Sequence, residues 1–340
     1  MTHSASRIGG FERATADDLA AVSLAKLDVE QLLPAFERLV AETVAQIEAC
    51  PAKPDPTFKG YESLLAAIRS ATTLEGTLLE KGIALVAVAN PDLVLVLLER
   101  PLPVHETAKA VFRRNDWSRA SGLRLDSEVA TREFYKPDLL IVDGVRQLAL
   151  IIDVKRSVAS YKPRALAELR SRMMAGALVV RDVLERDHDA PPVARADIAI
   201  IDGASECRDE AKGVFALADL DWLLRIEGAA SAIGRLRDLY GNKVRAVLDA
   251  RCEAMVAPRF EQRRTTAGME GRVGRMQGHV DDELATSLDR ADGDARLDAD
   301  PNEADAECED GELQRRLPSH IATQNRRPRI AVGIASRGAH

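Results

Sequence analysis

The sequence is poor in aromatic residues, in cysteines and in long apolar runs. Aromatics make up 4% of 340 residues, so a core must be built mainly from Leu, Val, Ile and Ala, which the 46% apolar content allows. The four cysteines are too scattered for a CxxC metal site or a disulfide framework and are interpreted as reduced thiols. No run reaches the roughly 18 apolar residues that span a bilayer, and the N-terminal residues show no apolar signal segment. We therefore expect a cytoplasmic protein with no membrane partner.

Positive charge is not in excess either. The net charge of -7 argues against a protein that coats nucleic acid through bulk charge, although a local basic cleft is compatible with that total. The C-terminal charge is divided: residues 281–312 hold fourteen acids and two arginines, whereas residues 313–340 hold six arginines and no acid. Such blocks bury too little apolar area to offset chain entropy, so we expect a disordered tail over residues 259–340, acidic and then Arg-rich.

The first part of the chain has helical periodicity. Apolar residues within 15–49 recur at intervals of three and four, which predicts an amphipathic helical hairpin or arm. Residues 50–57 contain three prolines and mark a boundary. A helix from Tyr61 and a longer one over residues 72–90 follow, the latter ending before Pro91. We assign residues 1–57 to an N-terminal helical arm with a Pro-rich linker.

Apolar runs of strand length follow these helices, and the domain is expected to span residues 58–258. The expected elements are a strand at 92–104, strands at 139–142 and 148–152, a helix at 164–187, a strand at 194–203 and helical structure over 214–255. The central order is thus helix, three strands, helix, strand. This order predicts an α/β fold with C-terminal helices.

A predicted hairpin, YKPDLLIVDGVRQLALIIDVKRS, places charged residues at the edge of two buried strands. If the loop is Gly144–Gln147, paired residues have numbers that sum to 291, so Asp138 and Asp153 face each other across the ladder, with Cβ atoms about 4.5–5.5 Å apart. Lys155 is two residues beyond Asp153 and therefore shares its face. A register slip of two residues would leave the acids as diagonal neighbours.

Carboxylates this close repel each other unless a shared proton, a cationic side chain or a metal ion neutralises them. Lys155 can supply part of that charge. Mg²⁺ fits better, because it takes oxygen ligands and could use both aspartates and the backbone carbonyl of Val154. Lys155 would then hold or activate a water, a combination suited to phosphodiester hydrolysis.

The same residues resemble the signature of a known superfamily. Pro137-Asp138, fourteen intervening residues and Asp153-Val154-Lys155 are similar to the motif of the PD-(D/E)XK nucleases, which share the restriction-endonuclease-like fold. The resemblance extends to the order of elements over residues 72–203. It implies a restriction-endonuclease-like core of helix, three strands, helix and strand, and a nuclease that uses Mg²⁺, with Mn²⁺ as a substitute.

The resemblance also implies roles for individual residues. Asp138 and Asp153 would bind the metal, and Lys155 would act on the attacking water. A glutamate of the first core helix often completes the metal site, and Glu80 has the expected place, with Glu75 as a competitor. Since these glutamates are five residues apart on a helix, at most one should point into the site.

Basic residues near the motif are candidates for phosphate contacts, or alternatively a solvated surface. The candidates are Lys109, Arg113, Arg114, Arg119, Lys162 and Arg164. The expected partner is DNA or RNA, with a homodimer or protein partner through the N-terminal helices as a further expectation. Two other interpretations stay open: a catalytically silent DNA- or protein-binding module on the same fold, and an unrelated α/β scaffold whose acids cap strands.

Overall fold

The computed structural model describes the backbone of residues 24–114 and 123–273, and the side chains of residues 24–111 and 123–257. The chain divides into two compact units. The described part of the first unit is residues 24–114 and 123–252. The described part of the second, residues 253–273, belongs to one helix. Arg119 and the tail residues 274–340 lie outside the described residues.

The first unit is a mixed α/β structure around a five-stranded sheet of order β2-β5-β6-β7-β8. The strands β2, β5 and β6 are antiparallel to one another, whereas β6, β7 and β8 run parallel. The sheet strands are β2 (Leu93–Val96), β5 (Leu139–Asp143), β6 (Leu148–Lys155), β7 (Arg195–Asp202) and β8 (Val214–Ala216). Short ribbons pair β1 (Ala25–Lys26) with β9 (Ile226–Glu227) and β3 (Leu102–Pro103) with β4 (Phe134–Tyr135).

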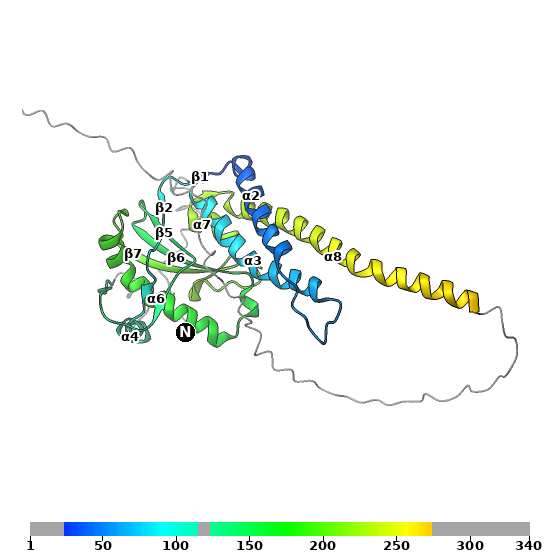
Figure 1. The fold of residues 1–340 in the computed structure, drawn as a ribbon. Coiled ribbons are helices and arrows are strands. Elements are labelled where there is room, and N and C mark those ends of the chain that lie inside the picture. Colours follow the sequence, from blue (N-terminus) through cyan, green and yellow to red (C-terminus); the bar gives the residue numbers. More distant parts are fainter. Residues whose placement is uncertain (1–23, 115–122, 274–340) are drawn as a thin grey trace, which may run out of the picture. The chain divides into compact units, whose positions relative to one another are not determined.

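Helices cover both faces of the sheet (Figure 1). The described α-helices are α2 (Val29–Ala49), α3 (Glu62–Ala87), α4 (Glu106–Arg114), α6 (Pro163–Asp187), α7 (Leu220–Leu224) and α8 (Ala229–Val273). Short 3-10 helices are η1 (Val158–Ser160), η2 (Glu210–Lys212) and η3 (Leu217–Asp219). Within the described residues, no helix is both long and apolar enough to cross a membrane.

The two faces of the sheet are distinguished by the alternation of residues along β6. Ala149 and Ile151 belong to a hydrophobic cluster that includes most of the buried residues of α6. Leu150 and Ile152 are equally buried but lie outside that cluster. The opposite face packs against α3, where a Cβ added at Gly203 would come 2.7 Å from Leu79 Cδ1. Odd-numbered residues of β6 therefore point toward α6, and even-numbered residues point toward α3.

The N-terminal arm is part of the first unit. In the described residues it is a single helix, α2, which packs against α3 and buries Phe36 and Ile47 completely. Asp28 caps its N-terminus by accepting a hydrogen bond from the Glu30 N–H at 3.2 Å. At the other end, Arg251 of α8 donates to the Ile47 carbonyl at 3.1 Å. Arg251 thus holds the C-terminal end of α2, and the pairing of β1 with β9 holds the chain just before α2.

The predicted strand over residues 92–104 is wrong in its length. The chain forms β2, leaves the sheet, and then forms β3, which pairs with β4 instead. Pro101 and Pro103 explain the break, because proline has no N–H to donate to a sheet ladder. The β3–β4 ribbon packs on α6. The single long strand that was predicted would not contain this ribbon, to which Tyr135 belongs.

The helical prediction over residues 214–255 is also wrong at its start. Val214–Ala216 forms the buried edge strand β8 beside β7, and a short apolar run of this kind does not distinguish strand from helix by periodicity. The helices predicted from Tyr61 and over residues 72–90 are one helix, α3. At the C-terminal end, α8 continues to Val273, beyond the boundary expected near residue 258.

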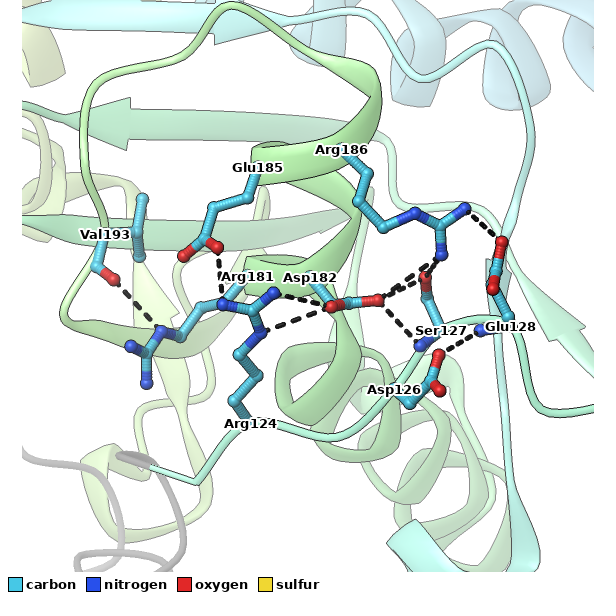
Figure 2. A network of polar contacts seen from close by, with 9 residues as sticks. All are labelled: Arg124, Asp126, Ser127, Glu128, Arg181, Asp182, Glu185, Arg186 and Val193. Carbon is cyan, nitrogen blue, oxygen red and sulfur yellow. Dashed lines mark hydrogen bonds and ion pairs between the residues drawn. The ribbon is translucent and has the colours of Figure 1, made fainter.

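A polar network ties residues 124–128 to α6 (Figure 2). Asp182 Oδ1 accepts hydrogen bonds from Arg124 at 2.7 and 3.2 Å, and its Oδ2 accepts the Ser127 N–H at 2.9 Å and hydroxyl at 2.7 Å. Arg186 links Ser127 and Glu128 to the same helix. Burial alone would raise the pKa of Asp182, but these donors outweigh it and lower that pKa below the ordinary 3.8.

The variant Asp182→Asn should lose about 2 kcal/mol of unfolding free energy at pH 7. Because the folded-state pKa is depressed, this contribution is complete above the ordinary pKa of 3.8, begins to fall below it, and is lost as the pH falls through the lower folded-state pKa. Urea denaturation at pH 7 and pH 3 measures the change. Asp126→Asn, an exposed aspartate of the same segment, is the control. An equal loss at both pH values would contradict the assignment.

Candidate active site

Asp138 and Asp153 lie opposite each other at the end of the β5–β6 ladder. The last pair of that ladder is Leu139 with Ile152, so the predicted sum of 291 is confirmed along the whole hairpin. Asp153 has the parity of Ile151, and Asp138 has the parity of Leu140. Ile151 and Leu140 belong to the cluster on the α6 side. Both aspartates therefore face the same side of the sheet.

The half-buried Asp138 completes the hydrogen bonding of β6 where β5 is absent. Its Oδ2 accepts the backbone N–H of Val154 at 2.7 Å. The β5 strand begins at Leu139, so no backbone carbonyl of β5 reaches this N–H, and the carboxylate takes its place. A charge-assisted hydrogen bond of this kind fixes the carboxylate beside Asp153.

Asp153 is almost completely buried, with 4% of its surface exposed. Its Oδ2 accepts a hydrogen bond from the Tyr135 hydroxyl at 3.2 Å. Its Oδ1 contacts the Lys155 ammonium and has no hydrogen-bond donor other than that cation among the described residues. This contact confirms that Asp153 and Lys155 share a face.

Lys155 is held as an ammonium ion. Burial alone would lower its pKa, but attraction and a hydrogen bond to Asp153, together with the charge of Asp138, outweigh burial and raise it. The ammonium also lies 5.9 Å from the ring centroid of the exposed Tyr161, within the range of a cation–π contact. Lys155 is thus a donor and a positive charge, and has no lone pair to accept a proton.

Tyr135 was not predicted as a site residue. It is 5% exposed, and burial, followed by the charges of Asp153 and Asp138, raises its pKa strongly, whereas the charge of Arg172 opposes the rise. The hydroxyl therefore stays protonated and donates to Asp153. The sequence offered only its position close to Pro137, which does not distinguish a site tyrosine from a core residue.

The expected glutamate does not join the two aspartates. Among the described residues, no three His, Cys, Asp or Glu side chains form a group that could hold a metal ion. Glu80 is half-buried on α3, which covers the opposite face of the sheet. Glu75 pairs with Arg156 at 2.9 Å and with Arg237 at 3.0 Å. Its charge is therefore already balanced by two guanidinium groups.

The oxygen atoms of Asp138, Asp153 and Val154 are of the kind that a hard divalent cation binds, but there are few of them. Asp138 and Asp153 supply carboxylate oxygens. In an extended strand the N–H and C=O of one residue point the same way, so the carbonyl of Val154 points toward Asp138, as its N–H does. Mg²⁺ usually keeps several waters and takes only one or two protein carboxylates beside substrate phosphates. A cation bound here would depend on water and substrate oxygens for the rest.

The predicted phosphate-binding residues differ in their surroundings. Lys109 is paired with Glu106 at 3.2 Å and contacts Glu133, which raises its pKa, so its charge is balanced within the domain. Lys162 and Arg164 are exposed at the N-terminus of α6, next to Tyr161. The side chains of Arg113, Arg114 and Arg119 lie outside the described residues.

The arrangement can bind a cation, hold a water by an ammonium donor, and face a phosphate with basic groups. Asp138, Asp153 and Lys155 are brought together from a turn and one strand, and Tyr135 joins them from β4. Comparisons of the chain with protein-family models, with curated proteins and with solved structures each found no match.

Proposed function

We propose that the protein is a Mg²⁺-dependent nuclease that hydrolyses phosphodiester bonds of DNA, on a restriction-endonuclease-like core. One observation carries the proposal: Asp138, Asp153 and Lys155 share one face at the end of the β5–β6 hairpin. The order α3, β2, β5, β6, α6, β7 and the antiparallel and parallel pairings of the sheet support the same core.

The other buried carboxylates offer a useful contrast. Asp143 lies between Arg146 at 2.5 Å and Arg225 at 3.0 Å. Asp202 accepts only backbone N–H groups within the described part of the chain. Arginine and backbone donors fix a carboxylate in a structural role. Asp153 instead faces a lysine and a tyrosine beside a second acid, which is the kind of arrangement that active sites favour.

In this proposal the oxygens of Asp138 and Asp153 and the carbonyl of Val154 hold the cation. The cation, when bound, supplies charge stabilisation at the phosphate and lowers the pKa of a bound water. The Lys155 ammonium donates a hydrogen bond to the attacking water or to a phosphate oxygen, and so orients the water for in-line attack. Tyr135 keeps the Asp153 carboxylate oriented.

The test is cleavage of supercoiled, linear, single-stranded and branched DNA by the wild-type protein. We expect cleavage with Mg²⁺ or Mn²⁺, none with EDTA, and a loss of at least about a hundredfold in Asp138→Asn and Asp153→Asn. Calorimetry with Mn²⁺ should show binding to the wild-type protein and much weaker binding to Asp138→Asn. Cleavage that is unchanged by EDTA and by both substitutions would refute the proposal.

A second candidate is a catalytically silent binding module on the same core, with DNA or a protein as partner. Two observations favour it. Among the residues that the structure describes, no third acid joins Asp138 and Asp153, and Lys155 contacts Asp153 directly, which balances one carboxylate without a metal. This candidate predicts DNA or protein binding that is independent of Mg²⁺ and absence of cleavage under all of the conditions above. RNA as substrate is tested with the same oligonucleotide series made in RNA.

A further inference from the structure

Arg172 of α6 has a buried Nε without an acceptor among the described residues, and the Nη2 of Arg170 shares that state. Arg170 donates from Nε to the Lys212 carbonyl at 3.0 Å, and Arg186 donates to the Ser127 hydroxyl at 2.9 Å. The Nε of Arg172 is buried and has no hydrogen-bond partner within the described part of the chain. A buried donor without a partner is costly and rare in folded proteins, so it calls for a ligand.

The position of Arg172 on α6 places it beside the candidate site. Gly176 is one turn further along and shares its face, and a Cβ added there would lie 3.5 Å from the ring of Tyr135. The positive charge of Arg172 acts on the same tyrosine, whose hydroxyl donates to Asp153. Arg172, Tyr135 and Asp153 therefore follow one another from the helix to the sheet.

Helix geometry directs Arg172 toward the open edge of the site. Side chains of an α-helix lean toward its N-terminus. The N-terminus of α6 begins at Pro163, just after Tyr161, whose ring centroid lies 5.9 Å from the Lys155 ammonium. We therefore expect the side chain of the half-buried Arg172 to extend toward the end of α6 near Lys155 and Tyr161.

The contacts that hold Asp138 and Asp153 in place run to groups other than Arg172. Asp138 accepts from the Val154 N–H, and Asp153 is taken by Tyr135 and Lys155. An anion from outside the chain can serve as an acceptor for Arg172. A phosphate suits it, because a guanidinium group offers paired N–H donors that match two phosphate oxygens.

We propose that Arg172 is a substrate-binding residue that holds a backbone phosphate of the nucleic acid beside Asp153 and Lys155. This inference rests on the proposed function, since it assigns the same site a phosphate ligand. It gives the nucleic acid a contact from α6 in addition to those from the hairpin. The contact is to the phosphate and carries no base specificity.

The experiment measures binding and stability together, without cleavage. Fluorescence anisotropy with a labelled DNA oligonucleotide in EDTA gives Kd for the wild-type protein, Arg172→Met, Arg172→Lys and the control Arg170→Met. Arg172→Met should weaken binding about tenfold or more, and Arg172→Lys should weaken it less. The slope of log Kd against log salt concentration should fall by about one in Arg172→Met, and in Arg170→Met it should not change.

Thermal unfolding separates substrate binding from a structural role. Removing a buried donor that has no acceptor should leave Tm of Arg172→Met unchanged or raise it by about 2–4 °C. Arg170→Met loses a hydrogen bond and should melt at a lower temperature. A lower Tm of Arg172→Met with unchanged Kd and salt slope would overturn the inference and give Arg172 a structural role.

The two proposals fail in different ways. If the wild-type protein cuts DNA but Arg172→Met binds and cuts as well as wild type, only the role of Arg172 is refuted. If the wild-type protein binds DNA without cutting it, the nuclease proposal is refuted, and the anisotropy series still decides the role of Arg172. Absence of both binding and cleavage in the wild-type protein refutes both.

Discussion

Lys155→Ala should reduce DNA cleavage by about a hundredfold to a thousandfold, the usual cost of losing one donor that stabilises developing charge. The ammonium is held against Asp153 and has a raised pKa, so wild-type protein keeps it positively charged at neutral pH. Single-turnover cleavage of a linear DNA at saturating Mg²⁺ measures the loss. Lys212→Ala, which removes an exposed lysine from a surface ion pair, is the matched control and should cut normally.

The same variant should respond to Mg²⁺ more strongly than the wild-type protein. Removing the ammonium leaves the buried Asp153 carboxylate with Tyr135 as its remaining partner, which should cost about 1–3 kcal/mol of stability. Mg²⁺ can replace that charge, so its addition should raise the Tm of Lys155→Ala more than that of wild type. Equal cleavage by both proteins would assign the activity to another site or to a contaminant.

The hairpin could be predicted because its determinants are local. Asp143 starts the turn and accepts the N–H groups of Val145 and Arg146, both at 2.9 Å, which fixes a four-residue loop. Loop length and alternation then fix the register, and the register sets Asp138 against Asp153. All of this information lies within about twenty residues of sequence.

The partners of the charged residues could not be predicted, because they come from distant elements. Glu75 pairs with Arg237, 162 residues away, and this pair depends on how α8 packs on α3. Lys109 of α4 contacts Glu133, which lies 24 residues further along the chain and directly precedes β4. A charge in a sequence does not reveal whether its counter-ion is solvent, a ligand or another side chain.

Tyr135 and Arg172 illustrate the same limit within the candidate site. Tyr135 reaches Asp153 because β4 pairs with β3 and packs against α6. The sequence pattern instead predicted that the residues of β3 continue the strand that begins at residue 92. The helical periodicity and composition of α6 do not set Arg172 apart from the other residues of that helix. The buried Nε of Arg172, without an acceptor among the described residues, and the charge of Arg172 acting on Tyr135 are properties of the packed structure.

Asp202→Ala should cause the largest loss of stability. Asp202 is completely buried, and its carboxylate accepts hydrogen bonds from four backbone N–H groups. These groups belong to Val158 at 2.9 Å, Ala204 at 3.2 Å, Glu206 at 2.9 Å and Cys207 at 2.7 Å. The variant leaves the buried Val158 N–H and three part-buried N–H groups without this acceptor, so the free energy of unfolding should fall by about 3–5 kcal/mol.

The loss should extend to the candidate site, because Asp202 is the register partner of Lys155. Its bond to the Val158 N–H fixes the chain that leaves β6 just after Lys155. Urea denaturation followed by circular dichroism measures stability. The control is Asp209→Ala, which removes one hydrogen bond from a half-exposed carboxylate and should lose less. Asp202→Asn keeps one acceptor oxygen and should lie between the two. If Asp202→Ala unfolded at the same urea concentration as Asp209→Ala, the carboxylate would not be the anchor of these loops.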